Sequence, residues 1–225
     1  MKTLKIIPAT LLAITLGLGT GTTLAYFTDA EHTTNEVTVG HIDVTLTEPH
    51  FSQTTVTGNP VVQFEEVAKD PIVTNVADAD DAIVFLKVTA PRENVHMVGN
   101  DGSLGTAQTQ ELYWFKQNSD AVAAHANHFR STWIELPKKE SAGTYVFGYQ
   151  TRLKPGESTD ALFDKVQRMR VLEESGNSVS DIKIQVYAIQ ADNVYNANHA
   201  FMDTTKVLTA DQLDYIYSVY VAQNG

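Results

Sequence analysis

The sequence predicts an all-β fold, an antiparallel β-sandwich with one or two short helices in the connections. Short runs in which apolar and polar residues alternate recur along the chain, and β-branched and aromatic residues are concentrated in them. Predicted helices do not alternate regularly with these runs, as they would in a protein with a parallel sheet. The hydrophobic fraction of 43% is sufficient for one sizeable core, so we expect a single domain over residues 26–225.

The first predicted strand lies within EVTVGHIDVTLTE, residues 36–48. Its apolar residues occupy one phase of the alternation before Gly40 and the other phase after it: Val37 and Val39, then Ile42, Val44 and Leu46. One extra residue in a strand returns the apolar set to the same face, and glycine tolerates the backbone conformation that this requires. We therefore predict a β-bulge at Gly40.

Six further runs predict strands, at residues 61–67, 82–89, 111–117, 132–136, 144–151 and 181–190. Turn-forming residues between them predict turns at 99–105 and 154–158 and a hairpin connection at 137–143. Two segments have helical character: the alanine-rich residues 120–129 and the C-terminal residues 209–223. Thr209 precedes Gln212 by three residues, which is the spacing of a capping box at a helix N-terminus.

Residues 1–25 have the organisation of a secretory signal peptide. Lys2 and Lys5 precede an apolar stretch, and small residues follow it up to Thr23 and Ala25. Glycines and threonines dilute the second half of the stretch, which makes it a poor membrane anchor. We predict cleavage between Ala25 and Tyr26, so that only the precursor contacts the membrane.

Charge and cysteine content restrict the partners. Of the 16 basic residues, two fall in residues 1–25, which contain no acidic residue; the remaining 14 oppose 27 acidic residues and give a net charge of −13. Nucleic-acid binding needs clustered Lys and Arg, so we expect no nucleic-acid partner. The chain has no cysteine, which excludes disulfides and is common in exported proteins of Gram-positive bacteria.

Two histidines are the first candidates for a metal site. His125 and His128 are three residues apart in the predicted helix, so both imidazoles could face one zinc ion, with an acidic third ligand such as Glu111 or Glu135. The HExxH spacing of metalloproteases is absent from the sequence. Two solvated histidines on a helix face are the simpler interpretation, and we expect no zinc.

Three aspartates, Asp78, Asp80 and Asp81, are the second candidates. Carboxylates at this spacing can share a calcium ion, but the glycine and the distal glutamate of an EF-hand are absent. An acidic solvated turn is the simpler interpretation. Nor does the sequence contain a G-x-S-x-G elbow, a P-loop or a dinucleotide-binding glycine motif. We therefore predict no catalytic residue and no cofactor.

Two elements near the N-terminus resemble the precursors of the camelysin and TasA family. Tyr26, Phe27 and Asp29 match a YF-x-D element that lies at the mature terminus in this family. A second element, N-x-x-x-x-G-x-(I/L)-D-(I/V)-x-L-x-E, is matched by Asn35, Gly40, Ile42, Asp43, Val44, Leu46 and Glu48. The segments KDPIVTN, AIVFLKVTAP, TYVFGYQTRLKPGESTDALFDKV and IKIQVYAIQADN are similar to clostridial-type members, so the resemblance covers most of the chain.

This resemblance implies a jelly-roll-like β-sandwich that is exported by Sec, processed by a specialised SipW-type signal peptidase and incorporated into the fibres of a biofilm matrix. It implies the extracellular matrix or the cell surface of a Gram-positive bacterium as the location, and self-association and an anchoring or accessory matrix protein as partners. Some family members are described as surface metallopeptidases, so a camelysin-like metal-dependent endopeptidase is the alternative function. A carbohydrate-binding module is a third, because jelly rolls often have that role.

Cleavage would leave residues 26–39 as a free arm ahead of the sandwich. Its predicted anchors are Tyr26, Phe27, Val37 and Val39, while the polar run 28–35 keeps the arm soluble. Such an arm can add a strand to the sheet edge of a neighbouring molecule, where backbone hydrogen bonds supply affinity. This contact is head-to-tail, so its repetition gives an open filament. We therefore predict a secreted structural protein, a fibre subunit that assembles by N-terminal strand donation.

Overall fold

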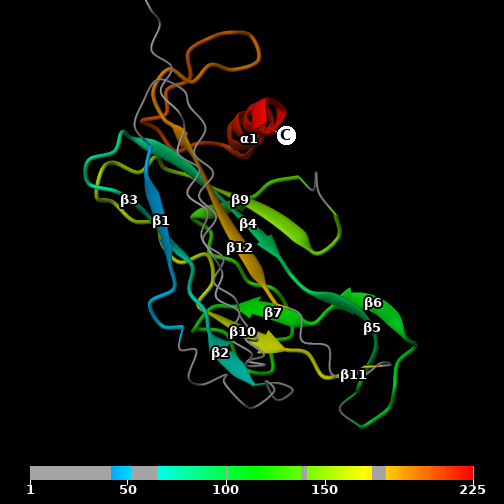
Figure 1. Ribbon diagram of the computed structural model, residues 1–225. Helices are drawn as coiled ribbons and strands as arrows, with labels where there is room; N and C mark the ends of the chain where they lie inside the picture. The colour runs from blue at the N-terminus through cyan, green and yellow to red at the C-terminus, as the bar shows by residue number, and fades with distance from the viewer. Residues whose placement is uncertain (1–41, 52–64, 100, 138–140, 174–180, 225) are drawn as a thin grey trace, which may run out of the picture.

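A computed structural model describes residues 42–51, 65–99, 101–137, 141–173 and 181–224 (Figure 1). The predicted leader, the cleavage site between Ala25 and Tyr26, the arm and the predicted bulge at Gly40 lie outside these residues. The described part contains twelve strands and one helix. They are β1 (Val44–Thr47), β2 (Glu66–Ala68), β3 (Ile72–Asn75), β4 (Ala82–Thr89), β5 (Arg92–Met97), β6 (Gln108–Glu111), β7 (Tyr113–Lys116), β8 (Trp133–Glu135), β9 (Thr144–Tyr149), β10 (Lys165–Arg168), β11 (Val171–Glu173), β12 (Lys183–Gln190) and α1 (Ala210–Asn224).

The strands form four sheets, with the orders β1-β3, β2-β10-β7, β11-β5-β6 and β12-β4-β9-β8. Every strand pair is antiparallel. The antiparallel, sandwich-like all-β class predicted from the sequence is therefore confirmed. The jelly-roll order of the strands stays a prediction.

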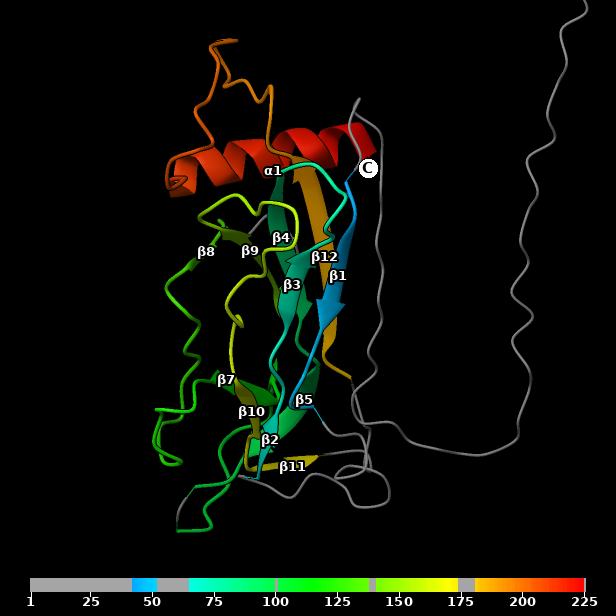
Figure 2. The ribbon, with the colours of Figure 1, turned by 90° about the vertical axis from the view of Figure 1, so that its left-hand side faces the viewer.

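Strand β4 is buried on both faces, because its sheet is covered on both sides. Val84 and Leu86 belong to the main core, which also contains Val44 of β1 and Val73 of β3. The alternate residues of β4, such as Phe85, belong to a second core beneath α1. Figure 2 shows α1 lying across one end of this sheet. Each large apolar side chain buried in this way contributes up to about 1.5 to 3 kcal/mol to the stability of the fold.

The C-terminal helix confirms the sequence prediction, including its cap. The backbone N–H of Gln212 donates to Oγ1 of Thr209 (3.3 Å), and Thr209 N–H donates to Oε1 of Gln212 (2.9 Å), which is a capping box. Leu213 of the helix is fully buried. Gly148 of β9 lies beneath it, and a Cβ at Gly148 would be 3.0 Å from Cδ2 of Leu213. The missing side chain therefore lets the helix approach the sheet.

Several predicted strands are confirmed with small changes in length. Strand β4 covers the whole predicted run 82–89, while β8, β9 and β12 are shorter than the runs 132–136, 144–151 and 181–190. Strands β8 and β9 pair as the predicted hairpin. Of the run 61–67, the structure describes only residues 65–67, of which the last two belong to β2.

The predicted strand 111–117 is divided into two, which corrects the sequence prediction. Strand β6 ends at Glu111 and β7 begins at Tyr113 in a different sheet. The fully buried Leu112 lies between them, where its N–H donates to the carbonyl of Pro91 and its carbonyl accepts from Met169 N–H. Leu112 begins a continuous run of apolar and aromatic residues that extends to Phe115, so the sequence gives no sign of the change of sheet.

Candidate functional site

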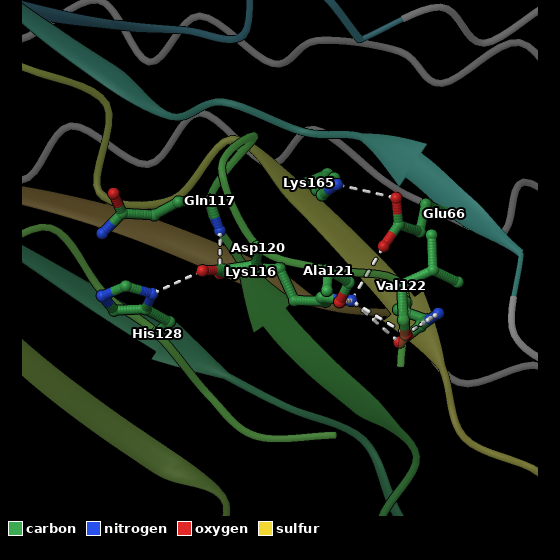
Figure 3. Close-up of polar contacts among 9 residues, drawn as sticks. Glu66, Lys116, Gln117, Asp120, Ala121, Val122, His128 and Lys165 are labelled. Atoms are coloured by element: carbon green, nitrogen blue, oxygen red, sulfur yellow. Dashed lines mark hydrogen bonds and ion pairs between the residues drawn. The ribbon is translucent and has the colours of Figure 1, made fainter. Parts of the chain in front are cut away.

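Lys116, the last residue of β7, places its ammonium group in the protein interior (Figure 3). The side chain is 0% exposed. Its Nζ donates to Oε1 of Glu66 (2.8 Å), to the carbonyls of Ala121 (2.8 Å) and Val122 (3.2 Å), and to Oε1 of Gln167 (3.2 Å). An ammonium group has three donors, so these acceptors satisfy it fully. The buried Nζ of Lys116 thus links β2, β10 and the segment that follows β7.

Glu66 connects this lysine to a second one. Nζ of Lys165 on β10 lies 2.7 Å from Oε2 of Glu66, and β2, β10 and β7 are neighbours in one sheet (Figure 3). Burial by itself would raise the pKa of Glu66, but the hydrogen bonds and charges of Lys116 and Lys165 outweigh it and lower the pKa below its ordinary value. One carboxylate thus joins all three strands of the sheet.

The prediction of a helix at residues 120–129 is wrong. The segment consists of turns and irregular structure. The carbonyl of Ala121 accepts from Nζ of Lys116 and, in a turn, from Ala124 N–H, while the carbonyl of Val122 accepts from Nζ of Lys116 and Nε2 of Gln167. The carboxylate of Asp120 accepts a backbone N–H bond of 2.7 Å from the residue three positions earlier. Hydrogen bonds from side chains to the backbone compete with helix formation. The segment is therefore not helical, although its alanine content favours a helix.

The two candidate histidines lie in separate environments on this segment. Nδ1 of His128 is 2.7 Å from Oδ1 of Asp120, and 57% of the histidine side chain is exposed (Figure 3). Burial by itself would raise the pKa of Asp120, but the hydrogen bonds from Gln117 and His128 lower it. The ring of His125 instead stacks on Trp114, with ring centroids 4.5 Å apart and an interplanar angle of 6°. Each histidine thus has its own partner.

The two acids considered as a third zinc ligand, Glu111 and Glu135, both lie near Tyr145. Glu111 accepts a hydrogen bond of 2.6 Å from the hydroxyl of Tyr145, while Glu135 is exposed on β8. Burial, followed by the bond to Glu111, raises the pKa of Tyr145 well above its ordinary value. Over the residues that the structure describes, no group of three or more His, Asp and Glu side chains is arranged to hold a metal ion.

The three candidate aspartates for calcium lie in the connection between β3 and β4. Oδ2 of Asp81 is 3.1 Å from Nε of Arg152, which makes an ion pair. Asp80 offers its backbone carbonyl to Nδ2 of Asn75 at 2.8 Å, while Asp78 is exposed. The structure thus makes this segment an acidic turn in which an arginine already neutralises one carboxylate.

A second buried ion pair was not predicted from the sequence. Nζ of Lys69 lies 2.7 Å from each carboxylate oxygen of Glu48, and the two side chains are 2% and 4% exposed. The adjacent Asp70 accepts from the backbone N–H of His50 (3.0 Å), and its other oxygen is 2.6 Å from Nδ1 of the same residue. These contacts fix the chain that leaves β1 against the connection between β2 and β3. Glu48 and Lys69 both lie in segments that resemble the camelysin and TasA family. The sequence does not show that these two residues pair.

Among the described residues, β12 lies at one edge of its sheet. In the order β12-β4-β9-β8, its neighbour among the described residues is β4, with which it pairs over all eight residues from Lys183 to Gln190. Edge strands are usually protected by proline, bulges or several charges, whereas β12 has no proline and carries only Lys183 as a charged residue. The chain enters β1 at the end of the molecule where α1 lies (Figures 1 and 2).

Comparison of the chain with protein families, with curated proteins and with solved structures finds no match. Within the described residues, no helix combines the length and the hydrophobicity that crossing a bilayer requires.

Proposed function

We propose that the protein is a secreted structural subunit of a cell-surface or biofilm-matrix fibre, related to the camelysin and TasA family, which assembles by N-terminal strand donation. The observation that carries the proposal is the edge position of β12, a regular strand of eight residues with little protection against pairing. A strand from a second molecule can extend this sheet through backbone hydrogen bonds.

The arm of residues 26–39 has the length and the pattern for this role. At roughly 3.3 Å per residue, its fourteen residues extend about 45 Å, which exceeds the length of about 26 Å for the eight residues of β12. Val37 and Val39 alternate with polar residues and can face the core of the neighbour. A contact between the arm of one molecule and the sheet edge of the next would be head-to-tail, and its repetition would give a fibre.

The first test compares the chain of residues 26–225 with a variant that lacks residues 26–35, by negative-stain microscopy and sedimentation velocity. We expect filaments from the first chain and monomers from the second. A matched control keeps Tyr26 and Phe27 but reverses the order of the polar residues 28–35, and it should still form filaments. Filaments of equal length from the deletion variant would contradict strand donation.

The second test asks whether the arm reaches β12. Because the chain has no cysteine, a pair of introduced cysteines reports a single contact. Thr38→Cys with Gln185→Cys should give a ladder of covalent multimers on a non-reducing gel, since a disulfide requires Cα atoms within about 7 Å. Thr38→Cys with Ser131→Cys, an exposed residue before β8, is the matched control and should give no ladder beyond dimers. Equal ladders from both pairs would remove β12 as the acceptor.

A further inference from the structure

A cleft of about 470 Å³ lies between α1 and the segment that follows β12. This volume is within the range of about 300 to 1,000 Å³ that is typical of small-ligand sites. Three tyrosines line it, Tyr195 from the segment and Tyr215 and Tyr220 from the helix. Tyr195 is 50% exposed, so its ring is accessible from solvent, whereas Tyr220 contacts the ring of Tyr187 at a centroid distance of 5.6 Å. The cleft therefore has aromatic walls, one exposed and one supported by the sheet.

The polar part of the lining consists mainly of neutral groups. The polar lining residues are Gln190, Asn193, Asn196 and His199, together with Asp192, whose carboxylate lies 3.4 Å from Nη1 of Arg152. No lysine or arginine is among the described residues that line the cleft. The lining thus offers mainly amides and one carboxylate that already has a partner, and the whole chain has a net charge of −11, which disfavours strongly anionic ligands.

The segment that forms one wall is held in shape by its own hydrogen bonds. Oδ1 of Asn196 accepts from the backbone N–H groups of Asn198 (2.9 Å) and Ala200 (3.0 Å). Two residues of the lining, Asn193 (φ 61°) and His199 (φ 57°), are the non-glycine residues with positive φ in the described part of the chain. Unfavourable backbone conformations of this kind persist where surrounding contacts enforce them, and they concentrate at binding sites.

We propose that this cleft binds a neutral polysaccharide. Sugar rings present apolar C–H faces that stack on aromatic rings, and hydroxyl groups that pair with amide and carboxylate side chains. The cleft offers both kinds of group, and Tyr195 is half exposed, so its ring is accessible to a sugar of a longer chain. This binding function is independent of the fibre and would let the protein join a protein lattice to matrix carbohydrate.

The test is isothermal titration of the chain of residues 26–225 with three neutral probes, cellohexaose, chitohexaose and mannohexaose, and with polygalacturonate as an acidic control. We expect at least one neutral probe to bind and polygalacturonate not to bind. Tyr195→Ala should weaken the binding by about tenfold, because an aromatic anchor in a pocket contributes a large share of the affinity. Tyr195→Phe keeps the ring and should stay within about threefold of the parent.

Two further variants separate a binding role from a structural one. Asn193→Gly keeps the positive φ at no steric cost but removes the amide, so it should weaken binding while the thermal midpoint is unchanged. Leu104→Ala, at an exposed apolar residue in the connection between β5 and β6, is the control and should bind as the parent does. Absence of binding to all three neutral probes at millimolar concentration would overturn the proposal. Binding that is insensitive to Tyr195→Ala would overturn it as well.

Discussion

The Nζ atom of Lys116 lies 2.8 Å from Oε1 of Glu66, although the two residues are 50 positions apart in the chain. The lysine is completely buried and the carboxylate largely so. A buried charge is tolerated only while its partners remain in place, since removal of one partner leaves the other uncompensated. The same contact also determines the path of the following segment, because the lysine binds the carbonyls of Ala121 and Val122.

Lys116→Met should lower the free energy of unfolding by about 3 kcal/mol, because Glu66 loses one of its two charged partners and the carbonyls of Ala121 and Val122 each lose one of two donors. Urea denaturation followed by circular dichroism measures the effect. Lys154→Met, at an exposed lysine in the turn before β10, is the matched control and should change stability by less than about 0.5 kcal/mol. A similar small change for both variants would show that the buried ion pair does not contribute.

The carboxylate of Glu66 should make stability depend on acidic pH. Its pKa in the folded protein is lowered from the ordinary value of 4.5, so its contribution is present above that value and is lost as the pH falls through the folded pKa. Glu66→Gln should therefore cost about 1 to 2 kcal/mol at neutral pH, and the difference from the parent should shrink below about pH 4.5. Unfolding curves at several pH values check this. A difference that is constant with pH would exclude the charge as the cause.

Lys69→Met should release the chain after β1, since Glu48 would stay buried without its counter-charge. We expect a loss of about 3 kcal/mol in global stability and faster hydrogen exchange of the amides of β1. The double variant Lys69→Met with Glu48→Met removes both charges and should recover part of the loss. If the double variant is no more stable than the single one, the ion pair is not the source of the effect.

Gly148→Ala should weaken the docking of α1 on β9. The added Cβ would lie 3.0 and 3.1 Å from the methyl groups of Leu213 and 3.1 Å from Cε1 of Phe85, which forces small shifts in a closely packed layer. We expect a loss of about 1 to 3 kcal/mol, with faster hydrogen exchange in α1 than in the distant β5. Gly105→Ala is the control, because its Cβ would have ordinary contacts of 3.5 Å or more. Unchanged exchange in α1 would contradict the role of Gly148.

The sequence by itself determined the class of fold and the elements whose signal is local. The run that became β4 has hydrophobic residues over a continuous stretch, because the strand is buried on both faces, and this is readable from neighbouring residues. The C-terminal helix was equally readable, since Thr209 and Gln212 form its cap across three residues. Such signals need no distant partner.

Only the tertiary structure decided which polar segments pair and which groups are buried. Strands β5 and β10 have largely polar sequences, and their pairing depends on β6, β11, β2 and β7, which lie elsewhere in the chain. The cleft beside α1 is lined by the helix and by the segment after β12, and the irregular segment 120–129 directs the carbonyls of Ala121 and Val122 to the buried Nζ of Lys116. The physical reason is the same in each case: a local sequence pattern specifies the conformation of a segment, whereas the free energy of burying a charge or a polar strand depends on partners tens of residues away.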